Sequence, residues 1–444
     1  MQRAHRTLRN GAASHRIVRF GAWYAPWLCM TLAHVCITYK ELKLSEKLLP
    51  FGTPEELGFC PVRTDRLISV LQDEINRKRL PGAVVLVARH GKIALFESLG
   101  YQRADDETPM TRESLFRIYS MTKPVVSVAV MMLMEQGKLL LGDPIAKYLP
   151  EFAEQMVLVN ANGQSELQPV GQGATIQDLL RHTAGLTYEF LGNSLLQKQY
   201  IQARIRTDLR DRSNADFTPV LAGLPLFAQP GSVWEYSRGT DVLGRLVEVL
   251  SGQTLGQHLR EQILKPLGML DTAFSVRPED HARIAEPFAR DPDGAPQMRV
   301  FDVRKPVAFE SGGGGLVSTA KDYARFLQFM LNRGELDGVR LLGPSIVDLM
   351  TSDHLGGIPV NAGGSRALLP QGYGFGLGFA VRTAKGVSTV PGSVGMYYWG
   401  GLAGTTFFVD PVEDLFAMLM VQAPNQREYY RHLLRNMVYS ALIR

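Results

Sequence analysis

The sequence predicts an α+β fold, an α/β sandwich in which one antiparallel sheet is flanked by helices and a mostly helical region is inserted. Three observations lead to this prediction. Two hairpin patterns, each made of two apolar runs around a turn, lie near the two ends of the chain, at 83–97 and 405–421. Most segments between them space their apolar residues as helices do. The simplest way to bury the apolar faces of these strands and helices is to join both hairpins in one sheet that the helices cover.

The first 53 residues form a basic and apolar extension. They hold eight Lys or Arg and two Glu, a net charge of +6 against +5 for the whole chain, so residues 54–444 carry about −1. A nearly neutral body gives no indication of nucleic-acid binding. Residues 20–39 lack charged side chains, and a basic lead before such a run is typical of an export signal or a membrane anchor, with an unstructured extension as the alternative. Membrane contact can therefore arise only through residues 20–39, and the compartment stays open, with the cytoplasm slightly favoured.

Residues 54–444 are expected to form one domain, with a sheet region at about 54–115 and 310–444 and a helical region at about 120–309. In chain order we expect a helix at 64–79, strands at 83–88 and 93–97, a helix from Ser120 to Gly137, a short helix from 176 that ends by Gly185, helices at 242–250 and 320–332, strands within 374–381 and at 405–409 and 415–421, and a helix at 426–442. The irregular stretch 151–235 is expected to be a helical, loop-rich insert that walls a pocket.

The chain is organised around residues 120–124, Ser-Met-Thr-Lys-Pro. Residues 125–134 are apolar at nearly every position, which predicts a helix buried in the middle of the domain. Pro124 lacks a backbone N–H and belongs in the first turn of that helix, so Ser120 lies at or just before its start. Lys123 follows one turn later on the same face. A hydroxyl, an amine and free N–H donors at a buried helix start are the parts of an activated nucleophile.

A second Ser-x-x-Lys, at residues 318–321, shows that this spacing alone does not identify a catalytic serine. There Thr319 and Asp322 predict a capping box before an ordinary amphipathic helix, which explains that serine without any chemistry. Capping is also the ordinary explanation for Ser120. The rest of the chain therefore has to decide between the two interpretations.

Several other features receive structural interpretations. None of the nine histidines has metal-ligand spacing, so no metal and no cofactor are predicted. His182 is expected to be a structural loop residue, since no catalytic motif surrounds it. The four glycines at 312–315 lack the ending of a phosphate-binding loop and are expected to let the backbone pass close to the core or the pocket.

Three stretches together resemble the motifs of one family. They are Ser120-Met121-Thr122-Lys123, then Tyr236-Ser237-Arg238, then Trp399-Gly400-Gly401-Leu402. In this order they are similar to the nucleophile, tyrosine and third, strand-borne motifs of the serine β-lactamase and penicillin-binding-protein superfamily. The closest branch is the class C β-lactamase-like carboxylesterases, called family VIII esterases. The resemblance covers about residues 54–444.

The resemblance implies a role for each matching residue. Ser120 would be the nucleophile that becomes acylated, and either Lys123 or Tyr236 would accept its proton, a choice that stays open. The oxyanion hole would consist of the backbone N–H groups of Ser120 and Leu402. The third motif would form an edge strand beside the serine, and its other members would contact the substrate. These substrate-binding residues are Trp399, Gly400 and Gly401.

Two departures from the β-lactamase pattern bear on the substrate. Arg238 stands where β-lactamases of this type usually have Asn, and Trp399-Gly400-Gly401 replaces a Lys-Thr-Gly. The missing lysine removes a cation for the carboxylate of a lactam, while Trp399 offers an aromatic face. This favours neutral, small-molecule esters, with β-lactam hydrolysis as a weak side activity.

The predicted function is therefore that of a serine hydrolase that cleaves short-chain carboxylic esters through an acyl-enzyme. Within this class the alternatives are a class C-type β-lactamase, a D-amino-acid peptidase and an acyltransferase. An alternative of another class, motivated by the basic and apolar extension, is a membrane-tethered acyl sensor that is acylated without turnover. The natural substrate and the oligomeric state stay open.

Overall fold

The computed structural model describes residues 48–443 except 162–163 and 207–210. The described chain belongs to one compact unit that begins at Leu48, and Leu49 already packs into its core. The apolar run at 20–39 lies outside the described residues. In the part of the chain that is described, no helix combines the length and the apolar character that crossing a membrane requires.

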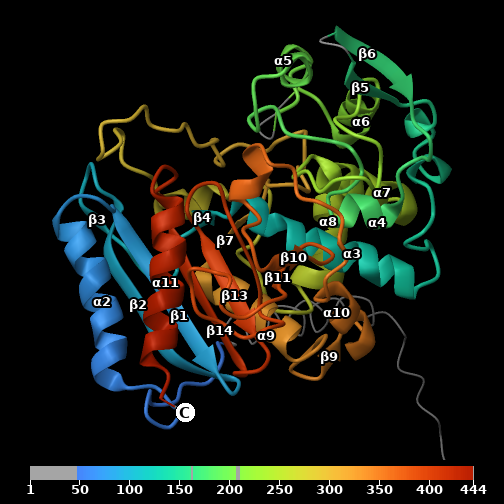
Figure 1. Cartoon of the computed structure of the whole chain (residues 1–444). Helices are drawn as coiled ribbons and strands as arrows, with labels where there is room; N and C mark the ends of the chain where they lie inside the picture. Colours follow the sequence, from blue (N-terminus) through green and yellow to red (C-terminus); the bar gives the residue numbers. More distant parts are fainter. Residues whose placement is uncertain (1–47, 162–163, 207–210, 444) are drawn as a thin grey trace, which may run out of the picture. The chain divides into compact units, whose positions relative to one another are not determined.

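One eight-stranded sheet, with the order β10-β11-β12-β13-β14-β1-β2-β3, organises this unit (Figure 1). Its strands are β1 (Gly82–Arg89), β2 (Lys92–Arg103), β3 (Thr108–Pro109), β10 (Tyr373–Phe375), β11 (Ala380–Arg382), β12 (Tyr397–Gly400), β13 (Thr406–Asp410) and β14 (Leu415–Val421). Every neighbouring pair is antiparallel. β1 pairs with β14, so strands from the two ends of the described chain meet in the middle of the sheet. The predicted α+β fold with one antiparallel sheet is confirmed.

Both predicted hairpins are present, and a third turn was missed. His90 and Gly91 join β1 to β2 with φ angles of 53° and 72°, the left-handed pair that a tight hairpin turn needs. The stretch 374–381 is not one continuous strand but the two strands β10 and β11. Gly378, with φ at 105°, reverses the chain between them.

Helices cover both faces of the sheet (Figure 1). Phe407 and Phe408 are consecutive on β13 and therefore point to opposite faces. The ring of Phe407 lies 5.5 Å from that of Tyr323 on α9, and the ring of Phe408 lies 5.3 Å from that of Tyr439 on α11. α2 lies beside α11. These covering helices are α2 (Pro61–Asn76), α9 (Ala320–Leu331) and α11 (Arg427–Ala441).

The helical region is built around α3 (Thr122–Glu135), which packs against α7 and α8. As predicted, α3 is apolar all round and is buried from Thr122 to Leu133. The other helices are α4 (Ile176–Leu180), α5 (Leu195–Gln202), α6 (Asn214–Ala222), α7 (Gly239–Ser251), α8 (Leu255–Leu259) and α10 (Pro344–Met350).

The insert at 151–235 is not only helices and loops, because it contains a hairpin of β5 (Met156–Ala161) and β6 (Gln164–Pro169). β6 is exposed along its whole length, and Leu167 and Pro169 are its only apolar residues, so it lacks the apolar alternation by which a half-buried strand is recognised. The described chain also contains two small pairs of strands. They are β4 (Phe116–Arg117) with β7 (Val317–Ser318), and β8 (Glu335–Leu336) with β9 (Val339–Arg340).

The second Ser-x-x-Lys is structural, as predicted. Thr319 is the N-cap of α9, and its hydroxyl accepts from the Asp322 N–H. The Asp322 carboxylate does not complete the predicted capping box but accepts from the Asp271 N–H and the Thr272 hydroxyl. Thr272 also contacts the buried hydroxyl of Ser318. The cap is confirmed, and Ser318 has its own partner.

Candidate active site

Ser120 lies in a tight turn directly before α3. A 3-10 turn, Tyr119–Met121, leads into the helix. Tyr119 has φ at 43°, in the left-handed region that residues other than glycine rarely adopt. Backbone strain of this kind clusters at functional sites. The turn leaves Ser120 partly exposed, while Lys123 in the first turn of α3 is completely buried.

The three residues predicted to do the chemistry meet at the Ser120 hydroxyl. The Tyr236 hydroxyl donates to Ser120 Oγ over 2.7 Å. The Lys123 amine lies 3.3 Å from the same oxygen. Tyr236 comes from the loop before α7, 116 residues after Ser120, yet the three residues form one hydrogen-bonded group.

Lys123 is surrounded by oxygen atoms that carry no full charge. Besides Ser120, its Nζ donates to the Gly313 carbonyl over 2.6 Å and to the Tyr188 hydroxyl over 3.0 Å. Burial lowers the pKa of Lys123 to about 7; Asp241 opposes this shift and Arg238 adds to it. The amine is therefore partly neutral near pH 7, and a neutral amine can accept a proton.

Tyr236 is buried among aromatic rings. The indole N–H of Trp399 donates to its hydroxyl over 3.3 Å, and the two ring centroids are 5.2 Å apart. His182 packs edge-on at 4.8 Å. Burial raises the pKa of Tyr236, against the opposing hydrogen bonds to Ser120 and Trp399. The phenol is therefore held protonated at neutral pH.

The third motif does not form an edge strand, so that prediction is wrong. β12 pairs with β11 on one side and with β13 on the other. β11 is short, however, and its pairing reaches only Tyr397 and Tyr398, so Trp399 and Gly400 pair with β13 alone. The end of the strand is thus free of β11 where Trp399 turns toward Tyr236.

Gly401 and Leu402 follow the end of β12. A Cβ atom at Gly401 would lie 2.5 Å from the Ile118 carbonyl, so only glycine allows this close approach of the two backbones. Ile118 is two residues before Ser120. Leu402 is the next residue and lies half-buried in the turn that follows β12.

Arg238 belongs to an ion cluster, which we define as Arg238, Glu189 and Asp241. Its Nη2 donates to the Glu189 carboxylate over 2.8 Å, and its Nη1 lies 3.3 Å from Asp241. Asp241 also accepts from the Gly313 N–H over 2.8 Å and from the Ser311 hydroxyl. The cluster thereby fixes the backbone whose carbonyl binds Lys123.

Sequence reasoning assigned no site role to Tyr188, Glu189 or Asp241. Tyr188 belongs to the irregular insert, and no spacing signal connects it to Lys123. Arg238 stacks on its ring, with 4.5 Å from the guanidinium carbon to the ring centroid. His182 shows no bond to Ser120; its Nδ1 lies 3.2 Å from the Ser237 hydroxyl, and burial lowers its pKa.

The chain is similar to several known proteins and to one family model. A family model described as Beta-lactamase matches residues 64–439. Esterase EstB of Burkholderia gladioli is 34% identical over 380 residues, which cover 80% of this chain and 89% of EstB. Lovastatin esterase of Penicillium rubens is 29% identical over 80% of this chain and 92% of its own length.

A solved structure has the same fold. EstCE1, described as a hydrolase with promiscuous acyltransferase activity, matches with a TM-score of 0.72 and 29% identity, over 85% of this chain and 98% of EstCE1. The family model covers most of the chain, and EstB exceeds 30% identity over four-fifths of it. The resemblance that the three motifs indicated is confirmed: the chain belongs to the beta-lactamase family, in the branch that contains EstB and EstCE1.

Proposed function

We propose that this protein is a serine carboxylesterase that hydrolyses short-chain esters through an acyl-enzyme on Ser120. The observation that carries the proposal is the contact of the Ser120 hydroxyl with Tyr236 at 2.7 Å and Lys123 at 3.3 Å. A serine hydroxyl is a poor nucleophile until a neighbouring group accepts its proton. EstB and lovastatin esterase are named for ester cleavage, which supports the same class of reaction.

The directions of two pKa shifts favour Lys123 over Tyr236 as the base. The pKa of Lys123 falls to about 7, so a large share of the molecules carries a neutral amine at neutral pH. The pKa of Tyr236 rises, so a tyrosinate is scarce there. In our proposal Lys123 accepts the Ser120 proton, and the protonated Tyr236 orients the hydroxyl.

The acyl-enzyme forms in one step and is hydrolysed in a second. Ser120 Oγ attacks the ester carbonyl carbon, its proton passes to Lys123, and the departing alcohol takes that proton. Water then attacks the acyl carbon by the same route, and the carboxylic acid leaves. We assign the oxyanion hole to the N–H groups of Ser120 and Leu402, supported by the close approach of Gly401 to Ile118. Losing one such donor typically costs about 10²–10³ in rate.

The surroundings of the serine support neutral esters as substrates. Trp399, Gly400 and Gly401 provide no cation where β-lactamases usually have a lysine. The Trp399 nitrogen is engaged by Tyr236, which leaves a neutral aromatic wall. We therefore expect short-chain acyl esters to be cleaved faster than β-lactams.

The test is a time course with p-nitrophenyl butyrate on the wild type and Ser120→Ala, with a chromogenic cephalosporin in parallel. Ser318→Ala is the matched control, because it removes the serine of the other Ser-x-x-Lys. We expect turnover to fall by at least about 10³ in Ser120→Ala and to persist in Ser318→Ala. Unchanged ester hydrolysis by Ser120→Ala would overturn the proposal.

The same experiment separates the alternatives. Fast cephalosporin hydrolysis would assign the protein to the β-lactamases, and cleavage of D-alanyl peptides would indicate a peptidase. EstCE1 is described as having acyltransferase activity, so an added alcohol that diverts the acyl group from water would indicate a transferase. A single burst of p-nitrophenol, with a stable acyl adduct on Ser120, would indicate a sensor.

A further inference from the structure

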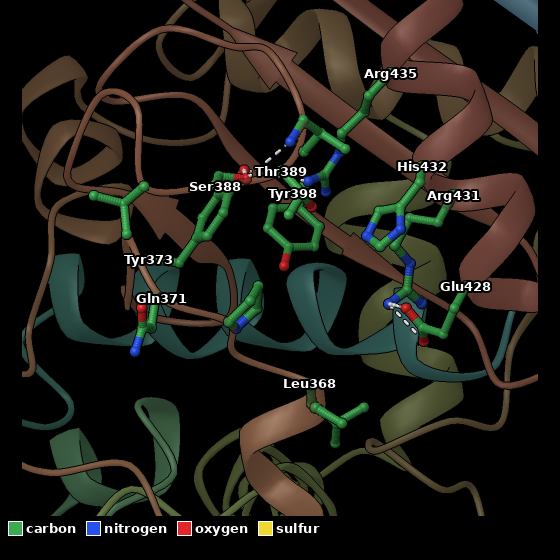
Figure 2. A pocket seen from close by; sticks show the side chains of 14 residues that line it. Leu368, Gln371, Tyr373, Ser388, Thr389, Tyr398, Glu428, Arg431, His432 and Arg435 are labelled. Atoms are coloured by element: carbon green, nitrogen blue, oxygen red, sulfur yellow. Dashed lines mark hydrogen bonds and ion pairs between the residues drawn. The ribbon is translucent and has the colours of Figure 1, made fainter.

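A cavity of about 270 Å³ lies under α11, outside the Ser120 cluster. Its floor and one wall are the Tyr373 and Tyr398 rings and the Arg431 and Arg435 side chains, and Leu368 stands on the opposite wall (Figure 2). Residues from 367–371 and 387–390 complete the lining. None of the residues to which we assigned a role in the hydrolysis lines this cavity.

Arg435 brings an unused donor to this cavity. Its side chain is 2% exposed, and its guanidinium carbon stacks 3.5 Å from the centroid of the Tyr398 ring. Nη1 donates to the Tyr373 hydroxyl over 3.4 Å. Nη2 is buried and has no hydrogen-bond partner among the described residues. A buried guanidinium with an unsatisfied N–H donor costs free energy unless a hydrogen-bond acceptor binds that donor.

Arg431 provides a second open donor one helical turn away. Residues i and i+4 share a face of a helix, so both arginines face the cavity. Arg431 pairs with Glu428 through Nη1 at 3.1 Å, while its buried Nε has no partner among the described residues. Burial and Arg435 lower the pKa of His432, which also lines the cavity, so its imidazole is neutral at pH 7. Two arginines against one glutamate leave an excess positive charge.

The rest of the cavity wall favours an organic acid over an inorganic anion. Leu368, Pro370, Val387 and Val390 line it together with the two tyrosine rings. A guanidinium matches a carboxylate in planar, charge-assisted hydrogen bonds, and apolar walls hold an apolar body. We propose that this cavity binds a small organic carboxylate, with its head on Arg435 Nη2 and Arg431 Nε and its body against the tyrosines.

The cavity adjoins the third motif, so two sources of the carboxylate have to be compared, an ester substrate and a free acid. A Cβ atom at Gly400 would lie 2.6 Å from Arg431 Nη2. Gly400 follows Trp399, which contacts Tyr236. The carboxylate can therefore belong to a free acid, or it can be the far end of an ester whose reacting carbonyl is held by Ser120. The second case would add anionic esters to the neutral esters that we expect as substrates. The ester case rests on the proposed function, whereas binding of a free acid does not.

The binding test uses benzoate, with neutral benzamide as its isosteric control, on the catalytically silent Ser120→Ala protein by calorimetry. We expect benzoate alone to bind, and Arg435→Gln in that background to weaken it about tenfold, as loss of a charged hydrogen bond does. Arg427→Gln, on the same helix but outside the cavity lining, is the matched control. Thr389→Trp places a large ring at an exposed position of the lining and leaves every α11 side chain unchanged, so it should abolish binding even if Arg435→Gln does not fold.

The ester test compares kcat/KM for p-nitrophenyl hemiglutarate and p-nitrophenyl valerate, which differ in one carboxylate. A preference for hemiglutarate that falls about tenfold in Arg435→Gln identifies the substrate as the source of the carboxylate. Benzoate binding with no such preference identifies a free acid. Benzoate that fails to bind, or that binds a folded Arg435→Gln or Thr389→Trp protein as tightly as the parent, overturns the proposal. An inactive enzyme that still binds benzoate refutes only the proposed hydrolysis.

Discussion

Two buried cations near Ser120 differ in their partners. Lys123 donates to a hydroxyl of Ser120, a hydroxyl of Tyr188 and a backbone carbonyl, so burial dominates and lowers its pKa to about 7. Burial acts on Arg238 in the same direction, but Glu189 and Asp241 outweigh it and raise the pKa of the guanidinium. One cation can therefore exchange a proton, and the other is a permanent charge.

The first residue-scale prediction concerns pH. If Lys123 is the base, kcat/KM for p-nitrophenyl butyrate should rise with pH through a midpoint near 7 and then reach a plateau, because only the neutral amine accepts a proton. Lys123→Arg stays charged and should lose at least about 10² in kcat/KM at every pH. A rate that is level from pH 5.5 to 8.5 would contradict the role of Lys123.

Tyr188→Phe tests which contact sets the midpoint of this pH profile. Its hydroxyl accepts from the charged amine over 3.0 Å, so its loss should move the midpoint to lower pH. Tyr200→Phe, another buried tyrosine of the same region, should leave the midpoint in place. Equal midpoints for Tyr188→Phe and the wild type would show that this contact does not set the pKa.

The second residue-scale prediction concerns Arg238→Asn, which restores the residue usual in related β-lactamases. It leaves Glu189 and Asp241 without their cation, and breaking a buried pair typically costs about 3–5 kcal/mol. Urea unfolding should show a loss of this size. Arg245→Gln, which breaks a more exposed pair with Glu248, should cost no more than about 1 kcal/mol. Equal losses would show that Arg238 is not needed for stability.

At the scale of elements, the glycine run 312–315 connects α3 to α7. Gly313 accepts from Lys123 through its carbonyl and donates to Asp241 through its N–H. A Cβ atom there would lie 2.9 Å from both the Asp241 carboxylate and the Tyr188 hydroxyl. The expectation that these glycines let the backbone pass close to the pocket is confirmed.

Gly313→Ala should therefore destabilise the protein by about 1–3 kcal/mol, as overpacking does, and should reduce ester turnover by displacing the acceptor of Lys123. Chemical denaturation and the butyrate assay measure the two effects. Gly142→Ala is the control, since nothing lies within 4 Å of a Cβ atom at that exposed position. Its stability should change by less than about 0.5 kcal/mol. A Gly313→Ala protein as stable and active as this control would refute the packing argument.

At the scale of the whole molecule, the sheet joins distant parts of the chain. β1 pairs with β2 and β14, and every residue of β1 and β14 is buried. β12 positions Trp399 in the same sheet, so the site depends on a sheet in which β1 pairs with a strand more than 300 residues later in the sequence. The β5–β6 hairpin is a separate two-stranded sheet with an exposed strand.

Hydrogen exchange followed by mass spectrometry should reflect this difference. Peptides from β1 and β14 should exchange slowest, because their amides open only when the unit unfolds. Peptides from β6 should exchange within the earliest time points. Comparable protection of β6 and β14 would contradict a stability centred on the large sheet.

Much of the fold and of the site follows from local patterns. The hairpins around His90–Gly91 and between β13 and β14, the buried helix after Ser120 and the cap at Thr319 each depend on neighbours in the sequence, and each is confirmed. The sequence analysis did not predict the hairpin of β5 and β6 or the turn at Gly378. An exposed strand and a short glycine-rich run show no clear hydrophobic period from which they could be recognised.

The sequence by itself determined the family, the antiparallel sheet with its helices, and the three motifs that meet at Ser120. Only the tertiary structure decided what surrounds them. It placed Tyr188 on Lys123, enclosed Arg238 between two carboxylates, put β12 inside the sheet and left Arg435 with an open donor under α11. Apart from the contact of Arg238 with Asp241, these contacts join residues that are distant in the sequence. Burial and charge, which set the pKa values, exist only after the chain has brought these residues together.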